Sequence, residues 1–208
     1  MIADLHAHTI HSDGILTVSE LIAKAKAKKL DVFSITDHDT FRGVREVEQK
    51  MMNDLKLIPG IELSTSYRGE SVHVLGYFQD VPDASGPLDA FIIKQKQIRD
   101  QRAKDMVVLI KKHFHLDLDA DALLLETNGV ITRSHIAKHI MKKYPNYTTS
   151  ELFETVLSND SKAYIPSTKI DTEEGIKLLR KSKALVVLAH PGIYKKMTLD
   201  VIKTLDLD

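Results

Sequence analysis

The feature that most constrains the fold is an alternation of short apolar runs with stretches of helical spacing. The runs are rich in β-branched residues, as is typical of buried strands, and they cover residues 2–5, 32–36, 57–61, 72–78 and 184–189. Between the first two runs, Thr17-Val-Ser-Glu20 has the pattern of a capping box and predicts a helix start. Helical spacing also predicts helices at 42–55, 172–182 and 198–205. Strand and helix in alternation predict a parallel α/β sheet or barrel.

The middle of the chain breaks this alternation. Residues 80–87 are rich in turn-forming residues and mark a boundary. A long charged helix is expected from Leu88 to about His113, with shorter helices at 119–126, 132–143 and 150–157. We therefore predict a helical insertion at 84–162 that separates two parts of one α/β domain, 1–83 and 163–208. Because the chain reaches Asp208 where the alternation requires another strand, we expect an unfinished, truncated core.

The composition excludes several classes of function. Lysine plus arginine equals aspartate plus glutamate, 29 each, which argues against sequence-blind binding of long nucleic acid but allows a small anionic substrate. The absence of cysteine excludes disulfides and thiolate catalysis. No secretory signal begins the chain and no apolar run has membrane-spanning length, so a cytoplasmic location and no membrane partner are expected. The unusual number is ten histidines.

Histidines and carboxylates follow or lie within the predicted strands. His6 and His8 are two residues apart, so an extended segment points both side chains the same way. Asp37-His38-Asp39 directly follows the run 32–36, and a cation would offset the crowding of these ionisable groups. Asp39 or Thr40 can instead be the N-cap of a helix.

The later strands continue this pattern. Glu62 directly follows the run 57–61, at the expected end of a strand, and can bridge two metals. His73 lies inside the next run, and His190 stands where Pro191 stops the last. Each alone has a plainer reading, an exposed glutamate or a core histidine. In combination they predict a nitrogen and oxygen ligand set, which suits Zn, Mn or Fe. More than four ligands suggest two or more metals. The other histidines, His11, His113, His115 and His139, are expected to be solvated or partly packed.

A separate motif lies in the helical insertion. Arg133 and His135 belong to Thr132-Arg-Ser-His-Ile-Ala137, at the expected start of a helix. A guanidinium there can bind phosphate through two hydrogen bonds, beside backbone N–H groups that also favour anions. The plainer reading is an exposed arginine beside a half-buried histidine.

These segments together resemble the PHP (polymerase and histidinol phosphatase) family. DLHAHTIHSDG resembles its opening motif, TDHDT its second, PGIE its third with His73 following, and AHP its fourth, across residues 1–80 and 163–208. TRSHIA within a helical insertion resembles the branch that includes nucleoside 3′,5′-bisphosphate phosphatases and exonucleases acting on short RNA.

The resemblance implies a distorted (β/α)7 barrel that binds two to three divalent metals (Mn, Zn or Fe) at the carboxyl ends of its strands. His6, His8 and Glu62 would hold one metal, and Glu62, His73 and His190 a second. Asp13 and His38 would contribute to a third site and, with Glu62, to catalysis. Arg133 and His135 would contact the substrate phosphate. The family's Asp-x-His ending, which completes the first and third sites, is missing through Asp208, so we expect the second site to bind metal most firmly.

The implied activity is hydrolysis of a phosphate ester of a nucleotide or short oligonucleotide by metal-activated water. The partner is then a small phosphorylated substrate. Two alternatives are a histidinol-phosphate phosphatase and a non-catalytic, structural metal-binding domain. The motif around Arg133 argues against the first, and retention of most of the ligand set argues against the second.

Overall fold

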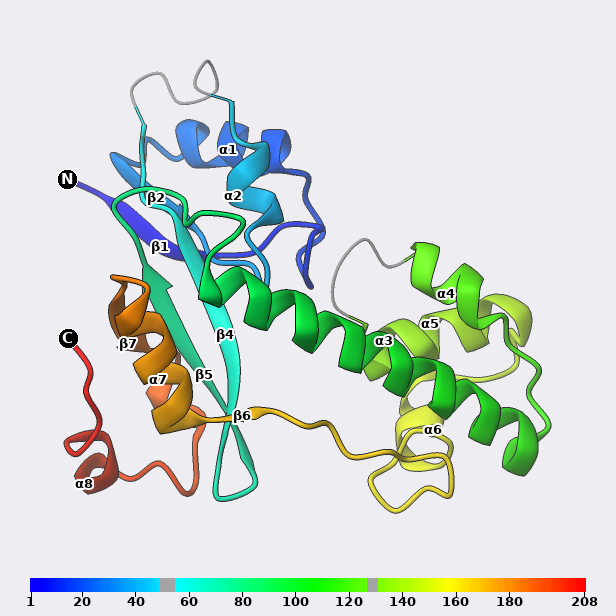
Figure 1. Cartoon of the computed structure of the whole chain (residues 1–208). Coiled ribbons are helices and arrows are strands. Elements are labelled where there is room, and N and C mark those ends of the chain that lie inside the picture. The colour runs from blue at the N-terminus through cyan, green and yellow to red at the C-terminus, as the bar shows by residue number, and fades with distance from the viewer. Residues whose placement is uncertain (49–54, 127–130) are drawn as a thin grey trace. The chain divides into compact units, whose positions relative to one another are not determined.

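The computed structural model describes residues 1–48, 55–126 and 131–208. They form two compact units, one of Met1–Ile93 with Lys169–Asp208 and one of Lys94–Thr168. The first unit contains every described strand (Figure 1). The second is helical, and the first two turns of its long leading helix belong to the first unit.

The strands of the first unit form two sheets. One is parallel, in the order β1 (Ala3–Ala7), β2 (Val32–Ile35) and β3 (Lys56–Leu57). The other has the order β6 (Ile170–Asp171), β4 (Gly60–Tyr67), β5 (Glu70–Tyr77) and β7 (Leu185–Leu188). Helix α1 (Val18–Ala27) connects β1 to β2, and its capping box joins Thr17 to Glu20 as predicted.

The second sheet is mixed, so the prediction of a parallel sheet is confirmed for the first sheet but wrong for the second. β5 pairs antiparallel with both β4 and β7, and only β4 and β6 are parallel. The cause is a tight hairpin at Arg68-Gly69, where both residues have positive φ, 49° and 80°. Such turns match the twist of antiparallel strands. The predicted run 57–61 is divided between β3 and β4, with Ile58 and Pro59 outside both strands.

The two sheets meet at Glu62. His38, just after β2, forms a parallel bridge with Glu62, and the N–H of Asp39 donates to the carbonyl of Glu62 over 3.0 Å. The Asp39 carboxylate accepts from the N–H of Ser64. Asp39 is therefore not a helix N-cap, because α2 (Arg42–Glu46) begins after Phe41. The predicted extension of that helix falls partly on residues 49–54, outside the described residues.

Two apolar clusters cover these sheets. α1 and α2 enclose Phe33 and Ile35 of β2. α7 (Thr172–Lys181) buries Ile176 and Leu179 against β4, β5 and β7. A short 3₁₀ helix η2 (Pro191–Ile193) and α8 (Leu199–Ile202) follow β7.

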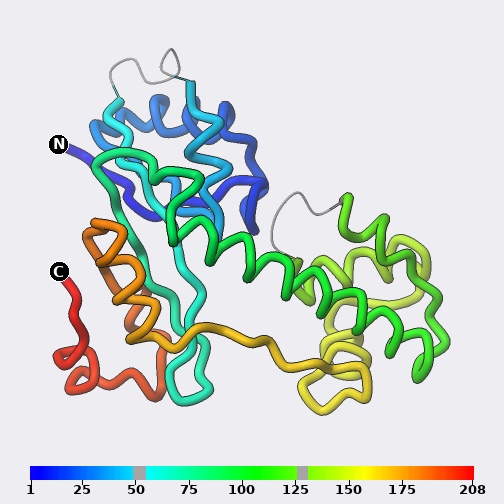
Figure 2. Tube along the Cα trace, viewed as in Figure 1, coloured from blue at the N-terminus to red at the C-terminus, as the bar shows by residue number. Residues whose placement is uncertain are grey.

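The second unit has its own core. Helix α3 (Pro87–Phe114), green in Figure 2, runs into this unit, which also contains α4 (Ala120–Glu126), α5 (Arg133–Lys143) and α6 (Thr149–Glu154). Met106, Ile110, Ile136, Ile140 and Leu152 are fully buried together. No helix in the described part of the chain is long and apolar enough to cross a bilayer.

Candidate metal centre

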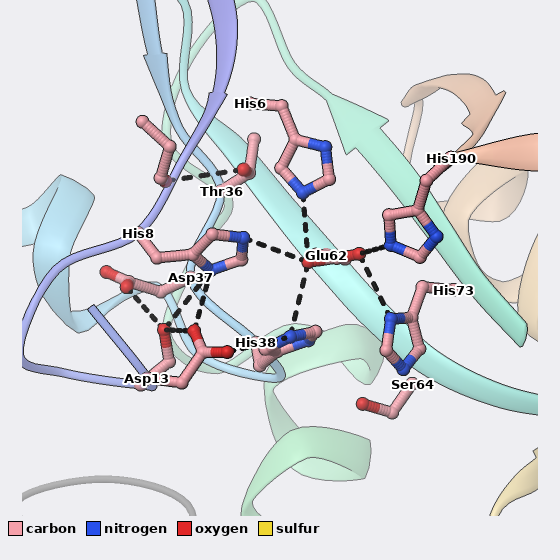
Figure 3. Close-up of polar contacts among 12 residues, drawn as sticks. His6, His8, Asp13, Thr36, Asp37, His38, Glu62, Ser64, His73 and His190 are labelled. Carbon is pink, nitrogen blue, oxygen red and sulfur yellow. Dashed lines mark hydrogen bonds and ion pairs between the residues drawn. The ribbon is translucent and has the colours of Figure 1, made fainter. Parts of the chain in front are cut away.

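The centre of the site is the carboxylate of Glu62, which is 1% exposed. Its two oxygens face two different sets of imidazole nitrogens, which come from several strands or strand ends (Figure 3). Near Oε2 lie His6 Nε2 at 3.0 Å, His8 Nε2 at 3.1 Å and His38 Nε2 at 3.4 Å, and near Oε1 lie His190 Nε2 at 3.0 Å and His73 Nδ1 at 3.1 Å. Glu62 is the third residue of β4 rather than the end of a strand, contrary to the prediction. It reaches the other strand ends because the sheets join there.

A second carboxylate completes the cluster. Asp13, half-exposed on the loop after β1, has its oxygens 3.3 Å from His8 Nδ1 and 3.6 Å from His38 Nε2. Possible ligand atoms of three residues each lie within 4.8 Å of one another in three sets: His6, Glu62 and His190; His8, Asp13 and His38; and His38, Glu62 and His73. The grouping differs from the one that the resemblance implied, because His6 also lies beside His190, with ring centroids 5.8 Å apart.

The electrostatics favour an ionised Glu62. Burial by itself would raise the pKa of this carboxyl, but hydrogen bonds from His6, His73 and His8 outweigh burial and hold the pKa far below its usual range. At neutral pH the ionised form of Glu62 is therefore favoured among the imidazoles, as a cation site requires.

Two of the imidazoles respond in opposite directions to the same surroundings. Burial lowers the pKa of His38, and the charge of Glu62 opposes this only in part. Burial also acts to lower the pKa of His8, but the hydrogen bond to Glu62 and the charge of Asp13 reverse the sign and raise it. His38 thus favours the neutral state in which imidazole binds metals.

The donor set fits divalent transition metals. It consists of imidazole nitrogens and carboxylate oxygens, which suit Zn, Mn and Fe. The buried Nδ1 of His73 lies 3.1 Å from Glu62 Oε1, so this nitrogen and this oxygen are close enough together to bind one cation.

Strain points to the same place. His190 has left-handed backbone dihedrals, φ 32° and ψ 59°, directly before Pro191. A non-glycine residue in this region costs about 1–3 kcal/mol, and such residues cluster at functional sites. The strain turns His190 out of the line of β7 and toward Glu62 (Figure 3).

The similarities to known proteins agree with this geometry. Residues 4–80 match the PHP domain model. The chain is 30% identical to the 5′-3′ exoribonuclease Rnm of Salmonella typhimurium, over 93% of this chain and 67% of that protein. The chain belongs to the PHP family. It is also 26% identical to the 3′,5′-nucleoside bisphosphate phosphatase of Chromobacterium violaceum, over 99% of this chain and 72% of the relative. A crystal structure from Bifidobacterium adolescentis, whose assignment as a metal-dependent phosphoesterase is itself a prediction, superposes with a TM-score of 0.81 and 28% identity, over 99% of this chain and 75% of the other.

The opening PHP motif is held by a buried carboxylate that the sequence analysis did not assign. Asp37 is 1% exposed and accepts hydrogen bonds of 2.7 Å from the Thr9 N–H, the Thr9 hydroxyl and the Ser12 hydroxyl. The Ser12 oxygen lies 3.3 Å from His8 Nδ1. A Cβ on Gly43 would stand 2.2 Å from Asp37 Oδ2, so glycine is required there. Asp37 therefore fixes the loop that carries His8 and Asp13.

A second correction concerns His11. We expected it in a solvated loop, but it is 8% exposed and its Nε2 lies 2.6 Å from Glu46 Oε2. This contact joins the loop after β1 to α2. The sequence offered no signal for it, because a histidine and a glutamate so far apart along the chain meet only through the fold.

Arg133 and His135 lie in the second unit, at the start of α5. Arg133 Nη1 donates to the Leu157 carbonyl and to Asn159 Oδ1, both at 2.8 Å, and its guanidinium lies over the rings of Tyr164 and Phe153. His135 Nδ1 accepts from the Thr132 N–H over 3.1 Å, in a capping box. Arg133 is thus a partly exposed side chain held in a fixed orientation.

Proposed function

We propose that this PHP protein hydrolyses a phosphate ester of a nucleotide or a short oligonucleotide. The observation that carries the proposal is one buried, ionised carboxylate, Glu62, with imidazoles gathered at both of its oxygens. This constellation lies in a family whose relatives include an exoribonuclease and a nucleoside bisphosphate phosphatase.

His6, His8, Glu62, His73 and His190 would hold two divalent ions (Mn, Zn or Fe), with Glu62 between them, and Asp13 with His38 would contribute to a third. Metals bound there would supply an activated water and neutralise the charge that develops on the phosphoryl oxygens. In the hydrolysis, a water oxygen bonds to phosphorus, the ester P–O bond breaks with its electron pair on the leaving oxygen, and that oxygen takes a proton.

We further propose that the strands belong to a distorted (β/α)7 barrel interrupted by a helical insertion at 84–162. In this proposal Arg133 and His135 bind a phosphate of the substrate. The fixed plane of Arg133 supports it, since Nε and Nη2 have no hydrogen-bond partner among the described residues and one guanidinium edge can form a two-point contact. We also propose a cytoplasmic location, where nucleotides and short RNA are present.

The test is a substrate panel on protein reconstituted separately with Mn²⁺, Zn²⁺ and Fe²⁺. It contains a nucleoside 3′,5′-bisphosphate, 5′-phosphorylated RNA of a few nucleotides, histidinol phosphate and a generic phosphodiester. We expect release of phosphate from the bisphosphate or of mononucleotides from the RNA, and loss of both after chelation.

Hydrolysis of histidinol phosphate alone would replace the proposed substrate class while keeping the reaction. No hydrolysis with any of the metals, in a protein that still binds them, would favour the structural alternative and contradict the proposal.

A further inference from the structure

The phenol of Tyr194 contacts two of the proposed ligands at once. Its hydroxyl lies 3.0 Å from His190 Nδ1 and accepts a hydrogen bond of 3.0 Å from the backbone N–H of His73. Tyr194 comes back to His190 because the 3₁₀ turn η2, with Pro191 at its start, reverses the chain between them. Its ring packs against the apolar cluster of Val72, Leu188 and Met197, which limits its movement.

A hydroxyl suits this position because it can both donate and accept. Since the His73 N–H takes one lone pair, the hydroxyl proton is available for His190 Nδ1. The other ring nitrogen of His190, Nε2, then carries a proton toward Glu62 Oε1, which is 3.0 Å away. When Nε2 instead serves as a ligand, the proton of the neutral ring is on Nδ1, and the same hydroxyl can accept it through its second lone pair.

The position of His190 also needs such support. Its backbone is strained, with φ 32°, and its side chain is partly exposed at the edge of the site. A histidine in that setting has several rotamers available unless its second nitrogen is held. The contact with Tyr194 keeps the plane of the ring toward Glu62 in both protonation arrangements.

We propose that Tyr194 is a positioning residue of the metal centre. Its hydroxyl orients His190 through Nδ1 and, by accepting the His73 N–H, joins the segment after β7 to the backbone of β5. The inference rests on the proposed metal binding. Its role is to raise metal affinity at the His190 side of Glu62, not to contact substrate.

The test is Tyr194→Phe, which removes the hydroxyl and keeps the packed ring. Tyr144→Phe is the matched control, because the Tyr144 hydroxyl also accepts a backbone N–H, that of Asp117, but in the helical unit. Affinity for Zn²⁺ and for Mn²⁺ is measured with the metal alone, by competition with a chromogenic chelator, and metal-free thermal melts are recorded for each variant. The visible spectrum of the Co²⁺-loaded protein gives a second, substrate-free readout.

We expect Tyr194→Phe to weaken the affinity of one bound ion about 10- to 100-fold, the range for residues that orient metal ligands. The Co²⁺ spectrum should change, the metal-free melt should stay close to wild type, and kcat/KM should recover at saturating metal. Tyr144→Phe should bind metal as the wild type does.

Unchanged affinity and an unchanged Co²⁺ spectrum in Tyr194→Phe would overturn the inference while leaving the proposed function intact. A lower metal-free melting temperature combined with normal affinity would also overturn it, because the role would then be structural. Conversely, a wild type that binds metal but hydrolyses nothing would contradict the proposed function without affecting this result.

Discussion

The candidate metal centre of the first unit and the Arg133 motif of the second could both be found as short motifs in the sequence, but the fold assembles them differently. Around Glu62, residues distant in sequence converge, and no local segment would place them together. Around Arg133, the key contacts are local to one helix start and the loop that follows the next helix. The first arrangement therefore depends on the whole α/β unit, and the second on a small part of the helical one.

The difference also concerns charge. Glu62 is a buried carboxylate among imidazoles, so its ionised state requires cations or protonated partners. Arg133 is partly exposed, stacked on aromatic rings and bonded to neutral oxygens, so it needs no counter-ion to be stable. Changes at Glu62 should therefore have larger consequences than changes at Arg133.

The largest effect is expected for Glu62→Gln. Breaking a buried charge pair costs roughly 3–5 kcal/mol, which corresponds to about a hundred- to several-thousandfold in affinity or rate. We expect the metal content after supplementation to fall at both proposed ion sites, the one near Glu62 Oε1 and the one near Glu62 Oε2. The value of kcat/KM should fall with the metal content. Elemental analysis and phosphate release check this, with Glu173→Gln, an exposed residue at the start of α7 in the same unit, as the control. Normal metal content in Glu62→Gln would show that Glu62 does not bridge.

The next largest effect is on the free energy of unfolding, and it is tested with one variant in each of the two units. Asp37→Ala removes three short hydrogen bonds at a buried site and leaves Thr9 and Ser12 without their acceptor. We expect a loss of about 2–4 kcal/mol, given roughly 1–3 kcal/mol for each unsatisfied group and incomplete additivity. Asp119→Ala removes two bonds to exposed N–H groups at the start of α4 and should cost about 1 kcal/mol.

Chemical denaturation of both variants measures this comparison. Similar losses for Asp37→Ala and Asp119→Ala would mean that the loop after β1 is held by other contacts, such as that between His11 and Glu46.

A smaller effect, confined to catalysis, is expected for Arg133→Lys. Lysine cannot form the two-point phosphate contact of a guanidinium, so kcat/KM should fall about ten- to a hundredfold, the equivalent of roughly 1.5–3 kcal/mol. Metal content should not change. Arg180→Lys, which pairs with Asp206 and Asp208 in the first unit, is the control. An unchanged kcat/KM on nucleotide substrates would leave Arg133 with a structural role only.

The smallest effect is a pH dependence of the metal-free protein. The folded-state pKa of Glu62 lies below the unfolded value of about 4.3, so its contribution to stability is present above that pH and is lost as the pH falls further. Thermal melts in the presence of a chelator should therefore decline more steeply from pH 5 to pH 3 for the wild type than for Glu62→Gln. Parallel declines would show that Glu62 does not carry this linkage.

Much of the helical structure could be predicted from local patterns. The capping box at Thr17, the long helix from residue 88 and the helix starting at Arg133 are found where the sequence placed them, because caps and helical spacing act over a few residues. The sheet was predicted less well. The antiparallel pairing of β4 with β5 follows from the turn at Arg68-Gly69, which the overall alternation of strand and helix did not indicate.

The sequence by itself determined which residues are available at the site. His6, His8, Asp13, His38, Glu62, His73 and His190 could all be named from motifs, since ligand types and two-residue spacings are local properties. Only the tertiary structure decided how they are grouped, that Asp37 holds the loop after β1, and that Tyr194 contacts His190, whose backbone is strained. The physical reason is that the bridge between His38 and Glu62 joins two sheets of different strand direction. Such long-range pairings leave no periodic trace in the sequence, so the geometry around Glu62 follows from the packing of the whole unit.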